Sequence, residues 1–287
     1  MVLAMLGFAI EDMFIKLAAE TVPVGQILII VGACGAAAYG LAAVFLGQPP
    51  IKAHMLRGAS GIRALFEGIA GLCFVTALAL APLSLVTMII QANPLLVTVG
   101  AALIFGETVG PRRWTAIAIG LAGVLLVLRP FGDSFEMTAL FAVAGVIANS
   151  ARDLATRAVT AQTSTVQLST LGFLAVIPGG ILSLLFTGDT LIWPDPLAWL
   201  WLAATVVTGI PALYCIIAAM RVGEMSHVAP FRYTRIVFGL VIGVVVFGER
   251  LDTLALAGAA IIVASGLYTF WRESRRSAAS KPLDPAV

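Results

Sequence analysis

Long apolar runs make up most of the sequence, and Pro, Gly and charged residues interrupt them repeatedly. Many of the runs approach ~20 residues, the helix length that crosses the hydrocarbon core of a bilayer. Turn-forming clusters separate them, for example Gln48-Pro49-Pro50, Arg129-Pro130 and Trp193-Pro194-Asp195-Pro196. The pattern predicts an all-α protein with ten transmembrane helices, at residues 2–19, 24–46, 62–80, 84–105, 111–128, 137–158, 166–186, 197–219, 225–247 and 251–270.

The composition favours a membrane protein over a soluble one. Apolar residues form 60% of the 287-residue chain and charged residues only 11%, against roughly 25% charged residues in soluble domains. No connection between the predicted helices is long enough for a soluble domain, and residues 272–287 are expected to form a short basic cytoplasmic tail. We therefore expect an integral membrane protein embedded in the lipid bilayer.

Charge and cysteine content exclude several other classes of protein. A net charge of +2 gives no support for a nucleic-acid partner. Cys34, Cys73 and Cys215 lie in apolar runs without C-x-x-C spacing, so they are expected to be packing residues rather than metal or redox groups. The sequence also lacks a phosphate-binding loop and the H-E-x-x-H and G-x-S-x-G motifs. We expect no cofactor, no metal and no enzymatic activity.

The distribution of Lys and Arg predicts the orientation in the membrane. With the N-terminus in the cytoplasm, eleven of the 17 Lys and Arg residues fall on the cytoplasmic side, two fall outside and four lie within spans. This bias predicts that both termini are cytoplasmic and that the protein resides in a cytoplasmic (inner) membrane.

Two sequence markers recur at nearly the same spacing. Phe105-Gly106-Glu107 recurs as Phe247-Gly248-Glu249, and Asp12-x-x-x-Lys16 recurs as Asp153-x-x-x-Arg157, so the two separations along the chain differ by a single position. The shared offset indicates a duplicated five-span unit, residues 1–130 and 137–271, with chance similarity between apolar helices as the alternative. Because five is odd, the second unit must be inverted in the membrane, as in many secondary transporters.

These features resemble the EamA-type members of the drug/metabolite transporter superfamily. The resemblance covers nearly the whole chain and rests on ten spans in two halves, on the Gly-Glu at the end of each fourth span, and on Ala81-Pro82-Leu83-Ser84 with its counterpart at residues 226–230. Ala229-Pro230-Phe231-Arg232-Tyr233 and Asp12-x-x-x-Lys16 are most similar to the branch that contains S-adenosylmethionine carriers.

The resemblance implies a secondary active transporter that works by alternating access, through a cavity lined by spans one, three, four, six, eight and nine. The expected substrates are small polar or zwitterionic organic metabolites, such as amino acids or S-adenosylmethionine-like compounds, with coupling to protons or to an exchanged solute. A riboflavin or organic-anion substrate is the alternative within the family, and a non-transporting helper subunit is the alternative outside it. A monomer and a homodimer both remain open.

Charged residues in the first and sixth spans are the first candidates for substrate binding. Asp12 and Lys16 are four residues apart and share a helix face, and Glu11 lies about 100° round the helix. The sixth span repeats the acid with Asp153 and adds Arg152. Either each acid–base pair neutralises itself and helps the two halves to dock, or one carboxylate couples transport to protons.

The third span contributes Arg63 and Glu67, which are also four residues apart. Arg63 lies near the cytoplasmic end, where a long side chain can extend to the membrane interface. Glu67 lies deeper, and it either pairs with Arg63 or helps to select the substrate.

Prolines in the fourth and eighth spans predict interruptions that expose polar groups. Pro94 lacks a backbone donor and frees a carbonyl group one turn earlier, with Gln91 and Asn93 beside it. Gly209-Ile210-Pro211 offers a second kink, and Tyr214 follows one turn later. A broken helix can form a binding site at the membrane midplane; a packed kink, satisfied by its neighbours, is the alternative.

The ninth span carries the richest set of candidates. Arg232 and Arg235 share a face, so an anion is needed near them to offset their repulsion. That anion is either a protein carboxylate or a substrate carboxylate or phosphate, which arginine can bind in a bidentate manner. Phe231 and Tyr233 can stack on an aromatic or cationic group. Arg235 and Glu67 lie outside the family pattern and are predicted to tune substrate choice.

Glu107 and Glu249 each follow a glycine at the end of a span. We expect both to be structural helix-end groups rather than catalytic residues. Their predicted partners are Arg112 or Arg113 for Glu107 and Arg250 for Glu249.

Overall fold

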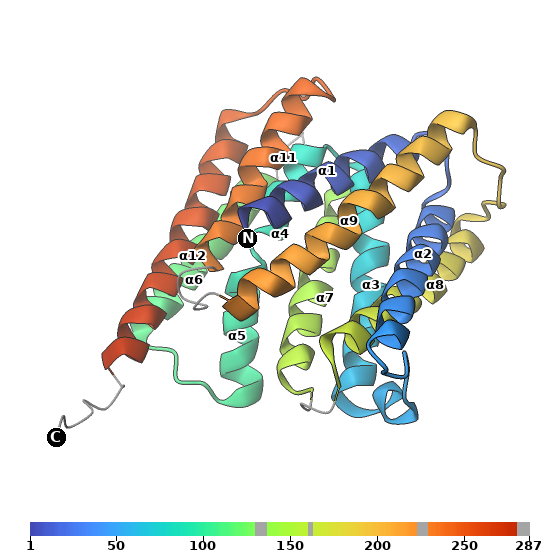
Figure 1. Ribbon diagram of the computed structural model, residues 1–287. Helices are drawn as coiled ribbons and strands as arrows, with labels where there is room; N and C mark the ends of the chain where they lie inside the picture. The colour runs from blue at the N-terminus through green and yellow to red at the C-terminus, as the bar shows by residue number, and fades with distance from the viewer. Residues whose placement is uncertain (130–136, 160–162, 223–228, 280–287) are drawn as a thin grey trace.

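The computed structural model is helical throughout the part of the chain that it describes, residues 1–129, 137–159, 163–222 and 229–279 (Figure 1). These residues contain no β-strand. The first half consists of α1 (Val2–Ala18), α2 (Val24–Phe45), the 3-10 helix η1 (Ala53–Leu56), α3 (Gly58–Leu80), α4 (Leu83–Ile90), α5 (Asn93–Phe105) and α6 (Pro111–Leu128). The second half consists of α7 (Ala139–Arg157), α8 (Thr165–Thr187), α9 (Pro196–Val222), the 3-10 helix η2 (Ala229–Tyr233), α11 (Thr234–Val245) and α12 (Thr253–Ala279).

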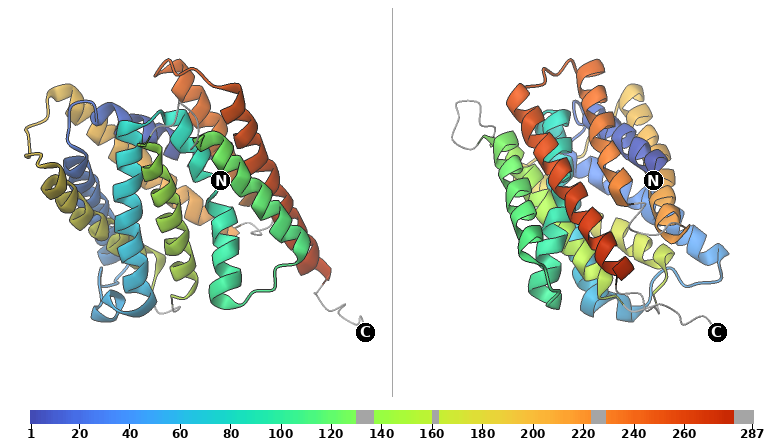
Figure 2. Two further views of the ribbon diagram at one scale, coloured as in Figure 1. Left: turned by 180° about the vertical axis from the view of Figure 1, so that it is seen from behind. Right: turned by 90° about the vertical axis from the view of Figure 1, so that its left-hand side faces the viewer.

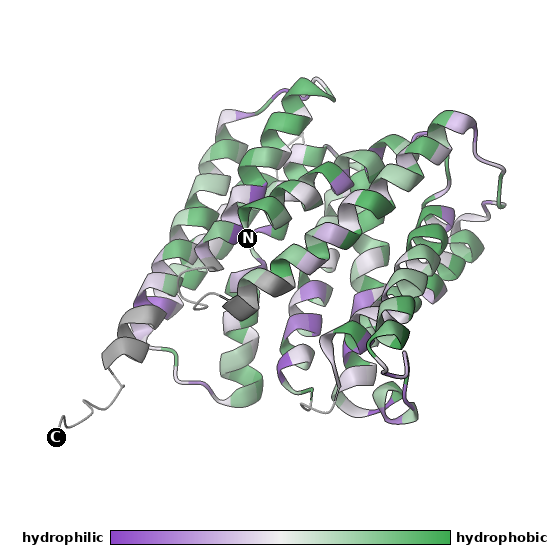
Figure 3. Cartoon of the chain, in the orientation of Figure 1, coloured by the Kyte–Doolittle hydropathy of each residue, from purple (hydrophilic) through white to green (hydrophobic). Residues whose placement is uncertain are grey.

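The outer surface of the bundle is apolar, as expected for a chain that spans a bilayer. Within the described residues, seven segments are long and apolar enough to cross a membrane, namely α2, α3, α4 together with α5, α6, α8, α9 and α12. Large apolar side chains such as Phe45 and Phe186 are 88% and 83% exposed, and Figure 3 shows hydrophobic residues along nearly every helix. The protein is therefore an all-α, multi-pass membrane protein.

Three helices that the sequence predicts as spans do not belong to this set of seven. α1 has only 17 residues and α11 only 12, whereas α7 has 19 residues but carries Arg152, Asp153 and Arg157. These helices hold most of the charged candidates. The charges that suggest a binding site therefore also lower the hydropathy of the helices that carry them.

Helices of the two halves pack against each other in pairs. α2 packs along α8, α6 along α12, α1 along α9 and α3 along α7, while α4 packs against α11. The α6–α12 and α2–α8 pairs form opposite edges of the molecule, and the other two long pairs cover opposite faces between them (Figures 1 and 2). α11 also packs against α1, and α4 and α5 pack against α7, so these three helices connect the two faces.

Small residues allow the edge pairs to approach closely. A Cβ atom added to Gly123 would lie 2.8 Å from the carbonyl oxygen of Gly258, and one added to Gly258 would lie 2.7 Å from that of Gly123. Gly25 of α2 and Gly180 of α8 meet in the same reciprocal way. Such small-residue crossings are common between membrane helices, because lipid provides no hydrophobic drive to bury larger side chains there.

The fourth predicted span is broken, as the sequence predicts. Gln91 and Ala92 separate α4 from α5, and Pro94 lies in the first turn of α5. In the second half, η2 leads into α11, and the start of the ninth predicted span, residues 225–228, lies outside the described residues. α9 instead continues as one helix through Pro211.

The repeated Phe-Gly-Glu tripeptide ends a helix in the same way in both halves. Gly106 and Gly248 adopt left-handed backbone angles, with φ of 66° and 64°. The N–H group of each following glutamate donates to a carbonyl oxygen six residues earlier, at 3.4 Å and 2.9 Å. Both are helix endings with a left-handed glycine, in which glycine avoids the steric penalty of a Cβ atom, and the closing hydrogen bond is one residue wider than in the Schellman motif.

The partners that the sequence predicts for the two glutamates are wrong. Glu107 pairs with Arg157 of α7 at 3.2 Å. Glu249 accepts hydrogen bonds from the backbone N–H groups of Leu83 and Ser84 at the start of α4. Both carboxylates therefore reach across to a neighbouring helix instead of the arginines beside them in the sequence.

We predict that Gly106→Ala destabilises the protein through its backbone alone. No atom lies within 4 Å of a Cβ built at this position, but its φ is positive, so the cost should be about 1–2 kcal/mol. The matched control is Gly40→Ala, where an added Cβ meets only ordinary contacts at 3.8 and 4.0 Å. Thermal unfolding in detergent should show a lower midpoint for Gly106→Ala than for Gly40→Ala, and equal midpoints would contradict this.

Candidate functional site

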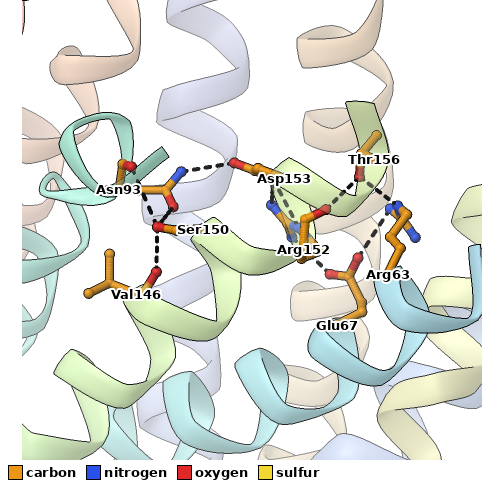
Figure 4. A network of polar contacts seen from close by, with 8 residues as sticks. All are labelled: Arg63, Glu67, Asn93, Val146, Ser150, Arg152, Asp153 and Thr156. Carbon is orange, nitrogen blue, oxygen red and sulfur yellow. Dashed lines mark hydrogen bonds and ion pairs between the residues drawn. The ribbon is translucent and has the colours of Figure 1, made fainter. Parts of the chain in front are cut away.

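A network of charged side chains joins α3, α5 and α7 (Figure 4). Nη1 of Arg152 donates to Oε1 of Glu67 at 2.9 Å, and its Nη2 donates to Oδ1 of Asp153 at 2.7 Å. Glu67 also pairs with Arg63 at 3.1 Å. Nδ2 of Asn93 donates to Oδ2 of Asp153 at 2.9 Å. Two arginines thus meet two carboxylates, and the network is electrically balanced.

The charged side chains of the network are not completely buried. The side chains of Glu67, Arg152 and Asp153 are 21–23% exposed, although they lie between packed helices of an apolar bundle. Charged side chains in membrane helices usually face a water-filled cavity or the bundle interior, because exposure to lipid is costly. We therefore expect their residual exposure to face the interior of the bundle rather than lipid.

Three ion pairs were predicted between residues four apart on one helix, namely Asp12–Lys16, Asp153–Arg157 and Arg63–Glu67. The first two do not form. Asp153 does not pair with Arg157, as their four-residue spacing predicts, but with the neighbouring Arg152. Arg157 extends to Glu107, and both side chains are about half exposed. Glu67 does pair with Arg63, yet it also binds Arg152 on α7. Packing between the two halves, which helix periodicity cannot show, determines these choices.

A second charged group joins α1 to α11. Asp12 and Arg235 form a bidentate ion pair, with Nη2 at 2.6 and 2.8 Å from the carboxylate oxygens and Nε at 3.2 Å. The rings of Phe8 and Phe74 lie 5.3 and 5.5 Å from the guanidinium, within cation–π range. Asp12 is only 4% exposed in its side chain, so this pair fixes the position of α1 against α11.

Lys16 takes a different role from the one that its spacing predicts. Its Nζ donates to the carbonyl oxygens of Leu78 and Ala81, at 3.0 and 2.6 Å, and lies 5.5 Å from the centre of the Phe247 ring. The predicted pair between Asp12 and Lys16 is therefore wrong. Asp12 is neutralised from the other half of the molecule, and Lys16 holds the junction between α3 and α4.

Arg232 is placed between these two groups. Asp153 attracts its guanidinium, whereas Arg152 and Arg235 repel it. Its side chain makes no hydrogen bond or ion pair with any residue that the structure describes. Asp153 already accepts from Arg152 and Asn93, so Arg232 has no ion pair of its own among the described residues.

Glu11 is the corresponding acidic residue. It lies beside a small cleft between α1, α2, α8 and α9, together with Thr205, Phe173 and Gly209. A side chain at Gly209 would overlap the Glu11 carboxylate, so α9 makes room for it there. Within the described part of the chain, the carboxylate has no hydrogen bond or ion pair, while Asp12 next to it is fully occupied by Arg235.

Gln91 connects the two broken spans. Its Nε2 donates to the backbone carbonyl oxygens of Tyr233 and Arg232, at 3.3 and 3.5 Å. The predicted polar group beside the helix break therefore satisfies the backbone of the other half. The hydroxyl of Tyr233 is buried against Gly266 of α12 and has no hydrogen-bond partner among the described residues.

Two aromatic candidates lie apart from these groups. Tyr214 is 69% exposed and Phe231 is 51% exposed, and neither belongs to the charged networks described above. The predictions that they bind substrate remain predictions. The described residues also contain no group of three or more His, Cys, Asp or Glu side chains that could hold a metal ion.

Sequence reasoning missed several supporting residues. Oγ of the buried Ser150 donates to Oδ1 of Asn93 at 2.7 Å and so orients the amide that binds Asp153. A signal was available here, because Ser150 lies one helical turn before Asp153. Phe8 and Phe74 gave no such signal, since an aromatic residue in an apolar run is indistinguishable from its lipid-facing or core neighbours.

The fold defines a multi-pass membrane protein in which apolar helices enclose charged side chains. The profile of the EamA-like transporter family matches residues 1–129 and again residues 136–271. The chain belongs to this family, and like its relatives it is a transporter and not an enzyme.

Its relatives carry different cargoes. The chain is 29% identical over 205 residues to a riboflavin transporter of Rhizobium johnstonii, covering 71% of this chain and 67% of the relative. It is 25% identical over 243 residues to an S-adenosylmethionine uptake transporter of Rickettsia prowazekii, covering 85% and 79%. It is also 25% identical over 269 residues to a pseudopaline exporter of Pseudomonas aeruginosa, covering 91% of both.

A solved crystal structure agrees with this fold over nearly the whole chain. The TM-score is 0.61 at 22% sequence identity, with 96% of this chain and 98% of the other covered. This similarity supports the helical architecture only.

We predict that the ion pair of Asp12 and Arg235 is strongly coupled energetically. Asp12→Asn and Arg235→Gln should each lower the thermal midpoint, because each leaves a charge without its partner in a poorly solvated site. The double variant should lose less than the sum of the two single losses, with a coupling of about 1–3 kcal/mol. Additive losses in a double-mutant cycle would contradict this assignment.

Proposed function

We propose that the protein is a secondary active transporter of small zwitterionic or polar organic metabolites, which it moves by alternating access. One observation carries the proposal. The acidic and basic side chains of Asp12, Arg235, Glu67, Arg152 and Asp153 satisfy one another, whereas Glu11 and Arg232, of opposite charge, have no such partners among the described residues.

A ligand with both an amino and a carboxylate group would satisfy this pair of charges. The guanidinium of Arg232 offers bidentate binding to a carboxylate, and Glu11 offers an acceptor for an ammonium group or a proton. The names of the S-adenosylmethionine and pseudopaline relatives are consistent with metabolite transport of this kind. We propose that coupling uses either protons or an exchanged solute.

A riboflavin or organic-anion substrate is the second candidate. It is favoured by the riboflavin transporter that is 29% identical to this chain and by the guanidinium of Arg232, which has no ion pair among the described residues. The two candidates differ in one residue: a zwitterion needs Glu11, whereas an anion does not. A non-transporting helper subunit, the alternative outside the family, would bind no metabolite at all.

We propose ten spans arranged as two inverted repeats, residues 1–130 and 137–271, followed by the tail at 272–287. In this arrangement α1, α7 and η2 with α11 supply the three spans beyond the seven apolar ones. The pattern of pairing supports it. Exchanging the halves converts the α1–α9 pair into the α7–α3 pair, and it maps the α2–α8 and α6–α12 pairs onto themselves.

A metabolite screen by thermal stability tests the substrate proposal. The true substrate should stabilise the purified protein by mass action, by ~2.7 kcal/mol at a hundredfold excess over its Kd. For a zwitterion, Arg232→Gln and Glu11→Gln should each abolish most of this stabilisation. Arg112→Gln, at an exposed site away from the charged groups, is the control.

The outcomes of this screen separate the candidates. Loss in Arg232→Gln alone would indicate an anionic substrate. Full stabilisation retained in both variants would contradict the assigned site, and the absence of any stabilising metabolite would favour the helper subunit.

Reporter fusions test the proposed topology. With both termini in the cytoplasm of a cell with an inner membrane, a reporter after Gln48 should report the cytoplasm and one after Gly188 the exterior, because these two loops lie at opposite ends of the bundle (Figure 1). The same side for both fusions would contradict the ten-span arrangement.

A further inference from the structure

The junction between α3 and α4 is held by two charged side chains from distant parts of the chain. From α1, Lys16 donates to the carbonyl oxygens of Leu78 and Ala81. From the loop after α11, Glu249 accepts from the N–H of Leu83 at 2.5 Å with Oε1 and from the N–H of Ser84 at 2.9 Å with Oε2. The cation thus binds the carbonyl end of α3, and the anion binds the amino end of α4.

The equivalent residues of the other half are engaged differently. Arg157 occupies the position of Lys16 in the repeated motif, as Glu107 occupies that of Glu249, and both glutamates come after the same left-handed glycine. Yet Arg157 and Glu107 bind each other at 3.2 Å, and both are about half exposed. The same two kinds of group therefore occur in two arrangements within one structure, once on a helix junction and once as a mutual ion pair.

We propose that Lys16 and Glu249 form a latch that closes the pathway at the face where α1 ends and α4 begins. This inference rests on the alternating access proposed above. The Glu107–Arg157 pair shows the arrangement that Glu249 and Lys16 would adopt after release. When the latched face opens, Lys16 and Glu249 leave residues 78–84 and pair with each other. Lys16 already lies over Phe247, two residues before Glu249, so this exchange needs no distant partner.

The chemistry of the two arrangements explains why such a latch can be released. A carboxylate at a helix N-terminus is stabilised by its hydrogen bonds to free N–H groups and by the helix dipole. A carboxylate paired with a lysine is stabilised by a charge-assisted hydrogen bond. Glu249 therefore has a favourable partner in both states, and neither state leaves a bare charge in the membrane.

The latch acts on a helix that leads directly to the candidate site. α4 has eight residues, with Glu249 at its start and Gln91, which binds the backbone of Tyr233, just after its end. Between these two attachments, Thr87 packs against Gly239 of α11. Release of Glu249 would leave α4 attached through the break at Gln91 and Ala92, so α4 could swing away from α11 there.

Thiol labelling of Thr87→Cys provides the test. Thr87 is 2% exposed and lies one turn inside the latch, so its cysteine should react slowly with a hydrophilic maleimide while the latch is closed. The background carries Cys34→Ser, Cys73→Ser and Cys215→Ser. Glu249→Gln should raise the labelling rate of Thr87→Cys about tenfold, because a neutral amide is a weaker acceptor for the N–H groups of α4.

Matched variants separate a latch from a general structural role. Glu107→Gln should change the rate less than twofold, because an exposed ion pair contributes little. Ala259→Cys, a buried position on α12 that is 4% exposed, should stay unreactive in the Glu249→Gln background. A parallel rise at Ala259→Cys would show general loosening and would overturn the latch, as would an unchanged rate at Thr87→Cys.

The labelling experiment needs no substrate, so its result is independent of the metabolite screen. If Glu249→Gln speeds the labelling of Thr87→Cys but no metabolite stabilises the protein, the latch is supported and the proposed substrate class is contradicted. If a metabolite stabilises the protein but Glu249→Gln does not speed the labelling, the latch is contradicted and the transporter proposal is supported.

Discussion

Neutralisation of charge within an apolar bundle is the constraint on which the rest of this structure depends. Taking a charged group out of water costs several kcal/mol unless a counter-charge and hydrogen bonds replace its hydration. Asp12 meets this constraint through a bidentate Arg235, and Glu67 and Asp153 meet it through Arg152. The Asp12–Arg235 and Glu67–Arg152 pairs each join two helices, so the charges that could carry function also contribute to how the helices pack.

The two halves depend on each other at the level of single side chains. Gln91, from the break in the first half, satisfies the backbone of Tyr233 in the second. Glu249, from the second half, binds the first N–H groups of α4 in the first. Broken helices within a membrane require such partners, because each leaves backbone groups that lipid cannot bind. Each interruption is therefore tied to the other half of the chain by a side chain.

Sequence patterns predicted the helices well and the partners poorly. Apolar length, Pro94 and the repeated Phe-Gly-Glu each act locally, so the seven apolar spans, the break after α4 and the two helix endings could be predicted. Asp12 with Lys16 and Asp153 with Arg157 also satisfy the local rule of four-residue spacing, but that rule compares only neighbours on one helix. Arg235 is 223 residues from Asp12. The periodicity of a sequence cannot predict which helix of the other half will lie opposite a given carboxylate.

The failure of local pairing carries functional information. Arg235 pairs with Asp12 and Arg152 pairs with Asp153, so Glu11 and Arg232 have no ion pair among the described residues. An apolar bundle would gain stability by losing both, since an unpaired charge away from bulk water is costly. One acidic and one basic side chain left over beside balanced networks would suit a solute that brings its own two charges. That solute would then satisfy the same constraint that orders the protein.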